Sequence, residues 1–217
     1  GWALVRILIT GGAGFIGCNL ADACIRAGHR VTLYDNLSRR GSEANLQWLR
    51  ASQGSDAFTF HRDDIRDFPA VLKVMRGQGA VYHLAAQTAV TTSVIDPRSD
   101  FEINALGTLN VLEAARQVGD DPVFIFASTN KVYGGMEDAA VLEEPTRFSQ
   151  PGYPQGVSEA RALDFHSPYG CSKGAADQYV RDYARIYGLR SVVFRQSCIY
   201  GQRQMGVEDQ GWVAWFV

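Results

Sequence analysis

Short apolar runs alternate along the chain with longer segments in which apolar residues recur at helical spacing. Several of the runs lack apolar–polar alternation, which is typical of strands covered on both faces of a sheet. The six candidate strands span residues 4–10, 30–35, 57–61, 80–85, 122–128 and 191–197. The candidate helices span 15–27, roughly 68–77, roughly 98–117 and roughly 168–187. This order predicts an α/β fold with a doubly wound parallel sheet, the Rossmann fold.

Two segments interrupt this pattern. Residues 134–167 form a long connection rich in Gly, Pro, Glu and Ser, and a loop of that length in a compact domain is usually functional or mobile. After residue 197 the chain reaches an apolar stretch of the kind that begins a helix packed on another part of a protein; it contains Trp212, Trp215, Phe216 and Val217. We therefore expect one domain over 1–197 and, over 198–217, only the start of a C-terminal lobe.

Composition and charge narrow the classes of function. The chain has 217 residues, 46% hydrophobic and 20% charged, with a net charge of -2, so a nucleic-acid or anionic-membrane surface is not expected. No apolar stretch approaches the roughly 20 residues of a membrane-spanning helix, and the chain is expected to be cytoplasmic. The four cysteines show no CxxC spacing and no nearby histidine completes a zinc pattern, so no metal site is predicted.

A glycine-rich turn joins the first strand to the first helix. The sequence TGGAGFIG at 10–17 places Gly11 for a tight turn, Gly14 for close approach of a pyrophosphate and Gly17 for close packing of the helix. Phe15 and Ile16 open the helix, whose N-terminus would face the phosphates. Alone, such a triplet also fits a purely structural turn.

A carboxylate at the end of the second strand strengthens the dinucleotide interpretation. Asp35 lies 18 residues after Gly17, where it would accept hydrogen bonds from the adenosine ribose and repel a 2′-phosphate, so NAD is expected rather than NADP. Arg39 and Arg40 leave the alternative open, since a guanidinium accommodates that phosphate. The further residues expected along the cofactor are Asn36, Ser38, Arg39, Asp64, Ile65, Leu84, Ala85 and Ala86.

Candidate chemistry follows the fifth strand and opens the last helix. Ser128 and Thr129 end a buried strand in the segment STNKVYG, where uncompensated polar groups are costly unless something binds. In YGCSK, Tyr169 and Lys173 lie four residues apart and hence on one helix face. A neighbouring ammonium would favour the phenolate of Tyr169 and make it a base near neutral pH. By itself this spacing is more often a surface pair.

In order along the chain, TGGAGFIG, Asp35, the DDI of 63–65, HLAA at 83–86, FEINALGTLN at 101–110, STNKVYG and YGCSK resemble the extended short-chain dehydrogenase/reductases that act on nucleotide sugars. The resemblance covers essentially the whole chain. It implies that 1–197 binds NAD and carries catalytic residues, and that 198–217 begins a substrate-binding lobe. It also implies Thr129 as the catalytic hydroxyl, Tyr169 as the base, Lys173 as its helper and Asn104 as support for the active-site helix beside the cofactor.

The residues after Thr129 separate two reactions within this family. Related 4,6-dehydratases carry an Asp-Glu pair there, whereas this chain has Asn130 and Lys131, which removes the acid and base of an elimination. Several segments, DNLSRRGSEANLQWL and DQGWVAWF among them, resemble the epimerases that convert CDP-paratose to CDP-tyvelose at C2 for bacterial lipopolysaccharide O-antigen. The candidate substrate contacts are Thr92, Ser93, Ser128, Thr129, Lys131 and Gln196. For Thr92 and Ser93, a helix cap before Pro97 is an equal alternative.

Other functions remain open at this point. The shared catalytic set also fits a UDP-sugar 4-epimerase or a nucleotide-sugar reductase, because the pocket decides the substrate. A non-catalytic NAD sensor or scaffold is a further alternative, although it has no need of Thr129, Tyr169 and Lys173 together. The resemblance also implies a homodimer formed by a bundle of the helices near 98–117 and 168–187. Without the rest of the C-terminal lobe, NAD binding is expected and the catalytic activity of this chain stays open.

Overall fold

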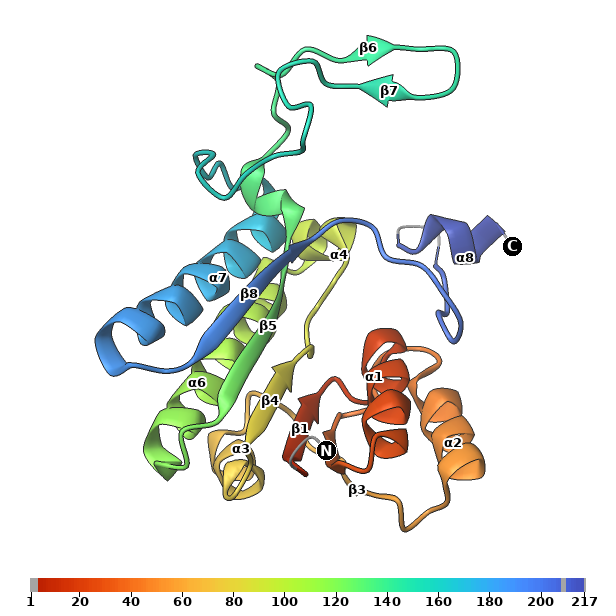
Figure 1. Cartoon of the computed structure of the whole chain (residues 1–217), viewed down its shortest axis with the longest axis vertical. Helices are drawn as coiled ribbons and strands as arrows, with labels where there is room; N and C mark the ends of the chain where they lie inside the picture. Colours follow the sequence, from red (N-terminus) through yellow and green to blue (C-terminus); the bar gives the residue numbers. More distant parts are fainter. Residues whose placement is uncertain (1–3, 208–209, 217) are drawn as a thin grey trace.

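The core of the protein is one six-stranded parallel sheet, seen in a computed structural model that describes residues 4–207 and 210–216 (Figure 1). Its strands are β1 (Arg6–Thr10), β2 (Arg30–Tyr34), β3 (Phe58–His61), β4 (Ala80–His83), β5 (Val123–Thr129) and β8 (Ser191–Gln196). They lie in the order β3-β2-β1-β4-β5-β8, and each neighbouring pair is parallel. This arrangement confirms the doubly wound parallel sheet that the alternation of strands and helices predicted.

Helices cover the sheet from both sides (Figure 1). One set packs with β1 to β3 and consists of α1 (Phe15–Arg26) and α2 (Ser42–Gln53). The other set consists of α3 (Phe68–Met75), α6 (Gly107–Val118) and α7 (Ser167–Tyr187). Two short helices, α4 (Val90–Ile95) and α5 (Pro97–Phe101), precede α6 and contact α7. Gly119 and Gly188 end α6 and α7 in the left-handed conformation, which glycine adopts readily.

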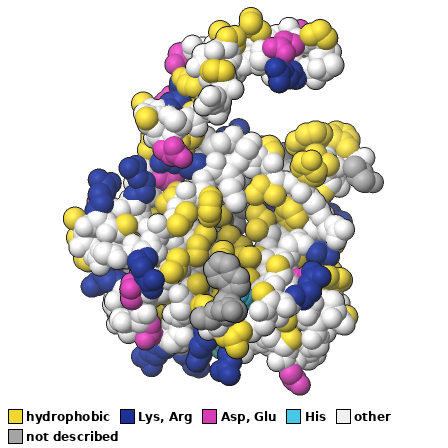
Figure 2. Space-filling model, in the orientation of Figure 1, with side chains coloured by type: hydrophobic (Ala, Val, Ile, Leu, Met, Phe, Trp, Pro, Cys, Tyr) yellow, Lys and Arg dark blue, Asp and Glu magenta, His cyan; other side chains and the backbone are white. Residues whose placement is uncertain are grey.

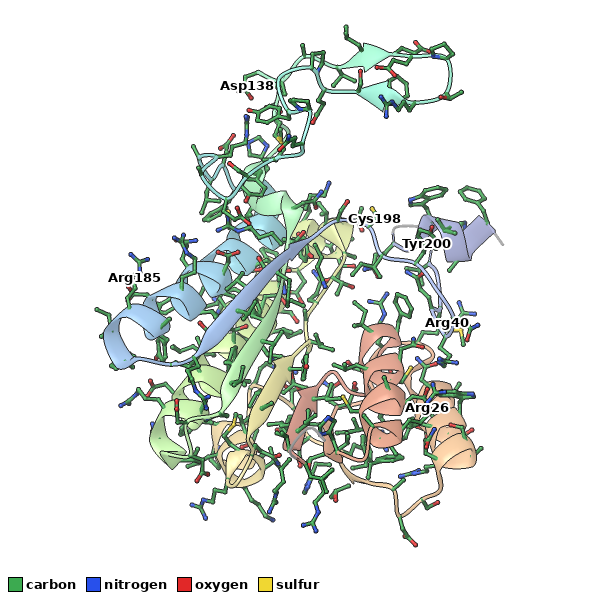
Figure 3. All side chains as sticks on the ribbon, viewed as in Figure 1. Arg26, Arg40, Asp138, Arg185, Cys198 and Tyr200 are labelled. Atoms are coloured by element: carbon green, nitrogen blue, oxygen red, sulfur yellow. The ribbon has the colours of Figure 1, made fainter. Side chains whose placement is uncertain are left out.

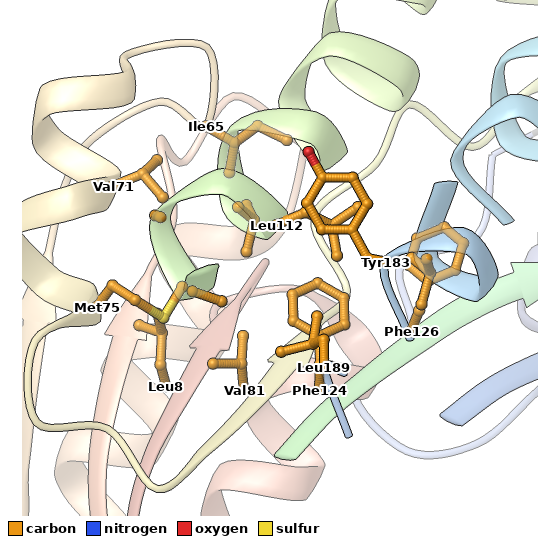
Figure 4. Close-up of a cluster of buried hydrophobic side chains, with 14 of the residues drawn as sticks. Leu8, Ile65, Val71, Met75, Val81, Leu112, Phe124, Phe126, Tyr183 and Leu189 are labelled. Atoms are coloured by element: carbon orange, nitrogen blue, oxygen red, sulfur yellow. The ribbon is translucent and has the colours of Figure 1, made fainter. Parts of the chain in front are cut away.

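Two apolar clusters hold these layers together, one on each side of the sheet. The larger joins the strands to α3, α6 and α7 through side chains such as Leu112, Phe124 and Phe126, which are at most 1% exposed (Figure 4). The smaller joins Ile9 and Leu33 to Leu46 and other residues of α1 and α2. Burial on both sides explains why the strands read as apolar runs without alternation.

The structure differs from the expected helices in two places. Helix α2 was not expected from the sequence, because Ser42 and Asn45 on its buried face are polar and mask the helical period. The single helix expected near 98–117 is divided into α5, a wide π-helical turn at Glu102–Leu106 and α6. Such wide turns often occur at functional sites, and this one carries Asn104.

Parts of the last strand and of the long connection are exposed. Val192 and Phe194 of β8 are 43% and 51% exposed, so the expectation of cover on both faces is wrong for this strand. Hydrophobic side chains gather along the middle of the same face of the molecule (Figure 2). Within 134–167, the short strands β6 (Leu142–Glu143) and β7 (Phe148–Ser149) pair in a hairpin that extends away from the sheet (Figure 1).

The C-terminal segment returns toward the N-terminal helices. Cys198 and Tyr200 lie on the stretch that leaves β8 (Figure 3), and α8 (Trp212–Phe216) follows it. The predicted division at residue 197 stays a prediction, and Val217 lies outside the described residues. Among the helices of the described residues, none is long and apolar enough to cross a membrane.

Candidate active site

The glycine turn forms a cradle at the carboxyl end of β1. Gly11 has a φ of 68°, and a Cβ there would lie 2.7 Å from the backbone nitrogen of Ala85. A Cβ on Gly17 would overlap the Gly11 carbonyl oxygen and lie 2.8 Å from Gly12 Cα. Gly14 caps α1 without a side chain, so the first turn of this twelve-residue helix is open to a ligand. A bare helix N-terminus beside a tight turn fits the pyrophosphate of a dinucleotide.

Asp35 faces this cradle from the end of β2. Its carboxylate accepts hydrogen bonds from the backbone nitrogens of Ala13 and Leu37, at 3.0 and 2.8 Å. Burial raises the pKa of Asp35, and these two hydrogen bonds oppose the rise. Arg39 donates instead to Thr88 Oγ1 at 2.6 Å and to Gln210. The Arg39 guanidinium is therefore bound by residues other than Asp35. This arrangement favours Asp35 as a partner of the adenosine ribose over a pocket for a 2′-phosphate.

The remaining cofactor candidates lie around the same crevice. Asn36 links the second and third strands, since its Nδ2 donates to Asp64 Oδ2 at 2.9 Å and its Oδ1 accepts from Ser38 N at 3.0 Å. Ile65 is 5% exposed and packs against the backbone of Gly107. The half-buried residues that border the turn and the end of β4 are Phe15, Ile16, Leu84, Ala85 and Ala86. The donors, small residues and carboxylate together fit NAD.

Thr129, Tyr169 and Lys173 come together across β5 and α7. Burial is the largest influence on the Tyr169 phenol and raises its pKa, the neighbouring Thr129 side chain lowers it, and the charge of Asp100 raises it. The pKa of Tyr169 is therefore above its usual value, contrary to the expected depression by Lys173. Burial causes this rise, and the Lys173 amine has other partners: its Nζ donates to the carbonyl of Ala127 at 2.6 Å and lies 4.4 Å from the centre of the Phe126 ring.

Lys173 is itself unusual because it is 5% exposed. Burial lowers its pKa to about 8, while the charges of Asp177 and Asp100 raise it. An ammonium has three N–H donors, and the bond to Ala127 uses one of them, so others remain for a ligand. A buried lysine with a shifted pKa beside a hydroxyl pair is typical of a functional site.

Ser128 has a different environment from its neighbour Thr129. The Ser128 hydroxyl donates to Asp177 Oδ2 at 2.7 Å, and Arg195 donates to both carboxylate oxygens of Asp177 at 2.9 Å. Arg195 also donates to the Tyr133 hydroxyl at 2.8 Å. Thr129 Oγ1 accepts the backbone N–H of Lys131 at 3.2 Å, so its proton is available to Tyr169 or to a substrate. Of the two hydroxyls, Thr129 is the better placed for chemistry.

The other candidate substrate contacts are not equally accessible. Thr92, Lys131 and Asn130 are exposed, and Gln196 pairs with Thr129 across β5 and β8. Ser93 is fully buried; its hydroxyl donates to Val90 O at 2.6 Å and accepts the Tyr169 N–H at 3.1 Å.

The capping alternative for Thr92 and Ser93 is wrong. Both residues lie inside α4, and the side chain of Asp96 caps α5 by accepting from Ser99 N. Ser93 instead fixes the position of Tyr169 by the hydrogen bond between α4 and the start of α7.

Asn104 is the centre of a buried polar network. Its amide nitrogen donates to Gln87 O, Asp100 Oδ1 and Ser172 Oγ at 3.0, 3.2 and 3.1 Å, and its Oδ1 accepts from Gln87 N at 2.9 Å. Ser172 lies between Tyr169 and Lys173 on α7. The network therefore ties the wide turn before α6 to the helix that carries the candidate base, as expected for a residue that supports the active-site helix.

Four residues around the site were not anticipated from the sequence: Gln87, Asp100, Asp177 and Arg195. A signal existed for the last two. Asp177 follows Lys173 by four residues, and Arg195 is a charge inside an otherwise apolar strand; a buried charge requires a partner. Asp100 and Gln87 had no such signal, because they lie in a segment whose polar residues resemble those of an exposed loop.

The segment after β8 lies against α1 and α2 beside this crevice. Asn19 Nδ2 donates to the carbonyl of Gln202 at 3.0 Å, and Asn45 Nδ2 donates to that of Arg203 at 3.2 Å. The Arg203 guanidinium binds Asn19 Oδ1 and lies 3.7 Å from the centre of the Trp48 ring. These contacts bring residues far apart in sequence to one side of the glycine turn.

Comparisons with known proteins agree with this geometry. A sequence model described as GDP-mannose 4,6 dehydratase matches residues 8–209. The chain is 50% identical to the CDP-paratose 2-epimerase of Salmonella typhi over 214 residues, which are 98% of this chain and 62% of that protein. It is similar to the Thermus thermophilus UDP-glucose 4-epimerase in complex with NAD, with a TM-score of 0.77 and 36% identity. The Thermotoga maritima UDP-glucose 4-epimerase with UDP-glucose has a TM-score of 0.79 and 34% identity. Both matches cover 97% of this chain and 61% of the solved structure.

Proposed function

The chain belongs to the GDP-mannose 4,6 dehydratase family, the NAD-dependent epimerases and dehydratases of nucleotide sugars, and from this premise we propose that it is the cofactor-binding part of a nucleotide-sugar epimerase. The family and its cofactor are those that the motifs predicted. Because the chain spans 62% of the length of its Salmonella typhi relative, the activity proposed is that of a protein with both lobes.

One observation carries the choice of epimerase. The Thr129 side chain lies close enough to the Tyr169 phenol to lower its pKa, but the two residues that follow Thr129 are Asn130 and Lys131, both exposed. Neither side chain supplies the carboxylic acid and carboxylate of an elimination. The site thus has a hydroxyl beside a phenol, a pair that can move one proton. At positions 130 and 131 it lacks the acid and the base that eliminate water.

The chain's own residues divide the proposed work. A bound NAD would supply reversible hydride transfer to and from one sugar carbon. Tyr169 takes the proton of the hydroxyl on that carbon and later gives it back. Thr129 donates to the phenol oxygen or to the sugar hydroxyl and so orients the two. Lys173 contributes a buried positive charge, and its N–H donors other than the one bound to Ala127 would hold a ribose hydroxyl of the cofactor.

The substrate we propose is CDP-paratose, converted to CDP-tyvelose at C2. Half of the residues are identical to those of a CDP-paratose 2-epimerase along 98% of the chain, which supports this substrate over a UDP-sugar. The product would supply tyvelose for lipopolysaccharide O-antigen. A UDP-glucose 4-epimerase is the second candidate, favoured by the two solved structures at 36% and 34% identity.

We also propose that two copies pair through the helices around α7. Phe101 of α5 and Ile186 and Tyr187 of α7 are 57%, 66% and 54% exposed. Large apolar side chains on neighbouring helices indicate a surface that another protein chain covers, in keeping with the helix-bundle dimer that the resemblance implied.

The test of the function is the variant Tyr169→Phe in the protein that carries both lobes. We expect the unaltered enzyme to form CDP-tyvelose from CDP-paratose and the variant to lose turnover by about 10²-fold or more, the usual range for a general base. Both should retain NAD, measured in the small molecules released on denaturation. Tyr179→Phe, at a 49% exposed position on the same helix, is the matched control. Turnover of UDP-glucose without turnover of CDP-paratose would select the second candidate, and undiminished turnover by Tyr169→Phe would refute the catalytic assignment.

A further inference from the structure

His83 is a buried histidine at the carboxyl end of β4, and both of its ring nitrogens have hydrogen-bond partners. The residue is 1% exposed, and its ring stacks on Phe126 with the ring centres 5.7 Å apart. Nδ1 lies 2.6 Å from Thr10 Oγ1 of β1, and Nε2 lies 2.9 Å from Thr108 Oγ1 of α6. A polar ring in the core is costly unless its hydrogen bonds are complete, so the direction of each bond decides what the ring does.

The bond between His83 and Thr108 has a fixed direction. The Thr108 hydroxyl lies 2.6 Å from the carbonyl oxygen of Asn104, and a carbonyl oxygen only accepts. The single hydroxyl proton of Thr108 therefore belongs to that carbonyl, and the bond to His83 uses a lone pair of Thr108 Oγ1. His83 Nε2 is the donor in this bond, so it carries a hydrogen.

The bond between His83 and Thr10 leads independently to the same tautomer. Thr10 Oγ1 accepts the backbone N–H of Ala85 at 3.3 Å and that of Leu84 at 3.2 Å, which the Thr10 carbonyl shares at 3.1 Å. A hydroxyl oxygen has two lone pairs and one hydrogen, so its hydrogen is left for His83 Nδ1. Nδ1 accepts, and the ring is neutral with its hydrogen on Nε2. Burial, which lowers the pKa of His83 to about 3, agrees with a neutral ring.

These bonds hold the backbone segment 84–86, which borders the cofactor crevice. At the start of the segment, His83 is tied to the Asn104 carbonyl through the intervening threonine of α6. Directly after the segment, the backbone of Gln87 forms two hydrogen bonds with the Asn104 side chain, at 2.9 and 3.0 Å. The segment is thus fixed at both ends to the wide turn Glu102–Leu106.

We propose that His83 is a positioning residue of this site: as the neutral Nε2–H tautomer, it fixes the cofactor-lining segment 84–86 to the turn that carries Asn104. The proposal deepens the proposed epimerase function, on which it rests for its purpose. Asn104 also donates to Ser172 of α7 at 3.1 Å, so the cofactor-lining segment and the helix with the candidate base share one anchor. The position requires a group that accepts on one side and donates on the other, which a neutral imidazole provides.

The tautomer is measurable in the unaltered protein. The chain has four histidines, and in protein labelled with ¹⁵N-histidine the NMR signals of the ring nitrogens distinguish a protonated from an unprotonated nitrogen. We expect the His83 ring to be unprotonated at Nδ1 and protonated at Nε2 from about pH 5 to pH 8, the range in which an unperturbed histidine changes its charge. The variant His83→Gln assigns the signals, because it removes them. A hydrogen on Nδ1, or a charged ring at about pH 7, overturns the proposal.

The variant Thr108→Val removes the acceptor of Nε2–H and nearly keeps the shape of the side chain. The ring then gains a hydrogen bond only through Nδ1–H to Thr10 Oγ1, which takes a lone pair from the backbone N–H of Ala85. We therefore expect the tautomer to change, the Ala85 amide to exchange its hydrogen faster, and the affinity for NAD to fall by at least about fivefold. Thr108→Ser keeps the hydroxyl and should restore all three.

A control variant separates this effect from a general loss of stability. Tyr183→Phe removes the hydrogen bond from a 7% exposed residue to Glu113, which lies on the same helix as Thr108. Its affinity for NAD should match that of the unaltered protein. Equal NAD affinity for Thr108→Val and the unaltered protein overturns the proposal, as does a loss that Thr108→Ser fails to restore. Should Thr108→Val fail to fold, the tautomer of the unaltered protein still supports or overturns it.

These measurements use NAD alone and no sugar. They keep their outcomes if the two-lobed enzyme turns over another nucleotide sugar or none. A failure of the proposed function would appear in the turnover of CDP-paratose, whereas a failure of this proposal would appear in the His83 ring signals and in the NAD affinity of Thr108→Val.

Discussion

The ion pair between Asp177 and Arg195 connects two elements of the site, and its removal tests how much it stabilises the fold. It joins α7 to the edge strand β8, and its side chains are 0% and 10% exposed. The variant Asp177→Ala leaves the Arg195 guanidinium without its carboxylate and the Ser128 hydroxyl without its acceptor. We expect this change to destabilise the fold and to loosen the position of Ser128 and Thr129.

The size of the effect follows from the burial. Removing one partner of a buried ion pair costs about 3–5 kcal/mol. Arg195 keeps its hydrogen bond to Tyr133 and a 10% exposed surface through which water reaches it, so we expect a loss at the lower end, about 3 kcal/mol. With a urea m-value of roughly 2 kcal/mol per molar, the unfolding midpoint should fall by about 1.5 M.

The assay is urea unfolding followed by far-UV circular dichroism. Asp182→Ala is the matched control, because Asp182 lies on the same helix and pairs with Arg185 at 3.8 Å with both side chains more than half exposed; such pairs are worth at most about 1 kcal/mol. The double variant Asp177→Ala with Arg195→Met should recover part of the loss, since it removes the stranded charge. A midpoint for Asp177→Ala no lower than that for Asp182→Ala would refute the reasoning.

The same pair also predicts a dependence on pH. Burial raises the pKa of Asp177, but the hydrogen bonds from Arg195 and Ser128 outweigh it, so the folded-state pKa lies below the usual value. The stability that the pair contributes is therefore present above the unfolded-state pKa of about 4 and is lost as the pH falls through the lower folded-state value. Urea midpoints measured down this range should converge for Asp177→Ala and the unaltered protein.

Two further predictions concern the glycine turn and the buried histidine. Gly17→Ala should weaken NAD binding by about 5- to 150-fold, because overpacking costs roughly 1–3 kcal/mol. Calorimetric titration with NAD measures the affinity, and Gly152→Ala, where a Cβ meets nothing within 4 Å, is the control. Equal affinities of Gly17→Ala and the unaltered protein would contradict the prediction. His83 has a folded-state pKa of about 3 against about 6.5 unfolded, so the unfolded state binds the proton first and the free energy of unfolding should fall by about 2 kcal/mol between pH 7 and pH 5. His83→Gln should flatten that fall in urea midpoints, and an equally steep fall in the variant would contradict the assignment.

The sheet was predictable from the sequence because burial on two faces leaves a plain signal. Runs such as residues 4–10 and 122–128 have no polar alternation, and Gly11 directly after the first of them marks where a turn begins. The exception is β8, where Val192 and Phe194 are exposed; hydrophobicity alone does not say whether a second layer covers a strand. Helix α2 was not predicted, because polar residues occupy part of its buried face and its apolar pattern is incomplete.

The candidate site was predictable as a set of positions but not as a network. The i, i+4 spacing of Tyr169 and Lys173 places both on one helix face, and STNKVYG marks the end of β5. The direction of Lys173 toward Ala127 and the contact between Ser93 and Tyr169 N depend on packing between helices distant in sequence. The same is true of Asp100, whose hydrogen-bond partners Gln87 and Ser172 lie in other parts of the sequence.

The close fit of Gly17 against the Gly11 carbonyl limits how this sequence evolves. A Cβ at position 17 would meet backbone atoms. A substitution elsewhere changes a side chain and leaves these atoms in place, so it would not relieve the overlap. Every amino acid one base away from a glycine codon carries a Cβ, so each missense mutation there meets the same obstacle. Only synonymous changes are therefore neutral at this position, and lineages that keep the cofactor are expected to keep this glycine while surface residues vary.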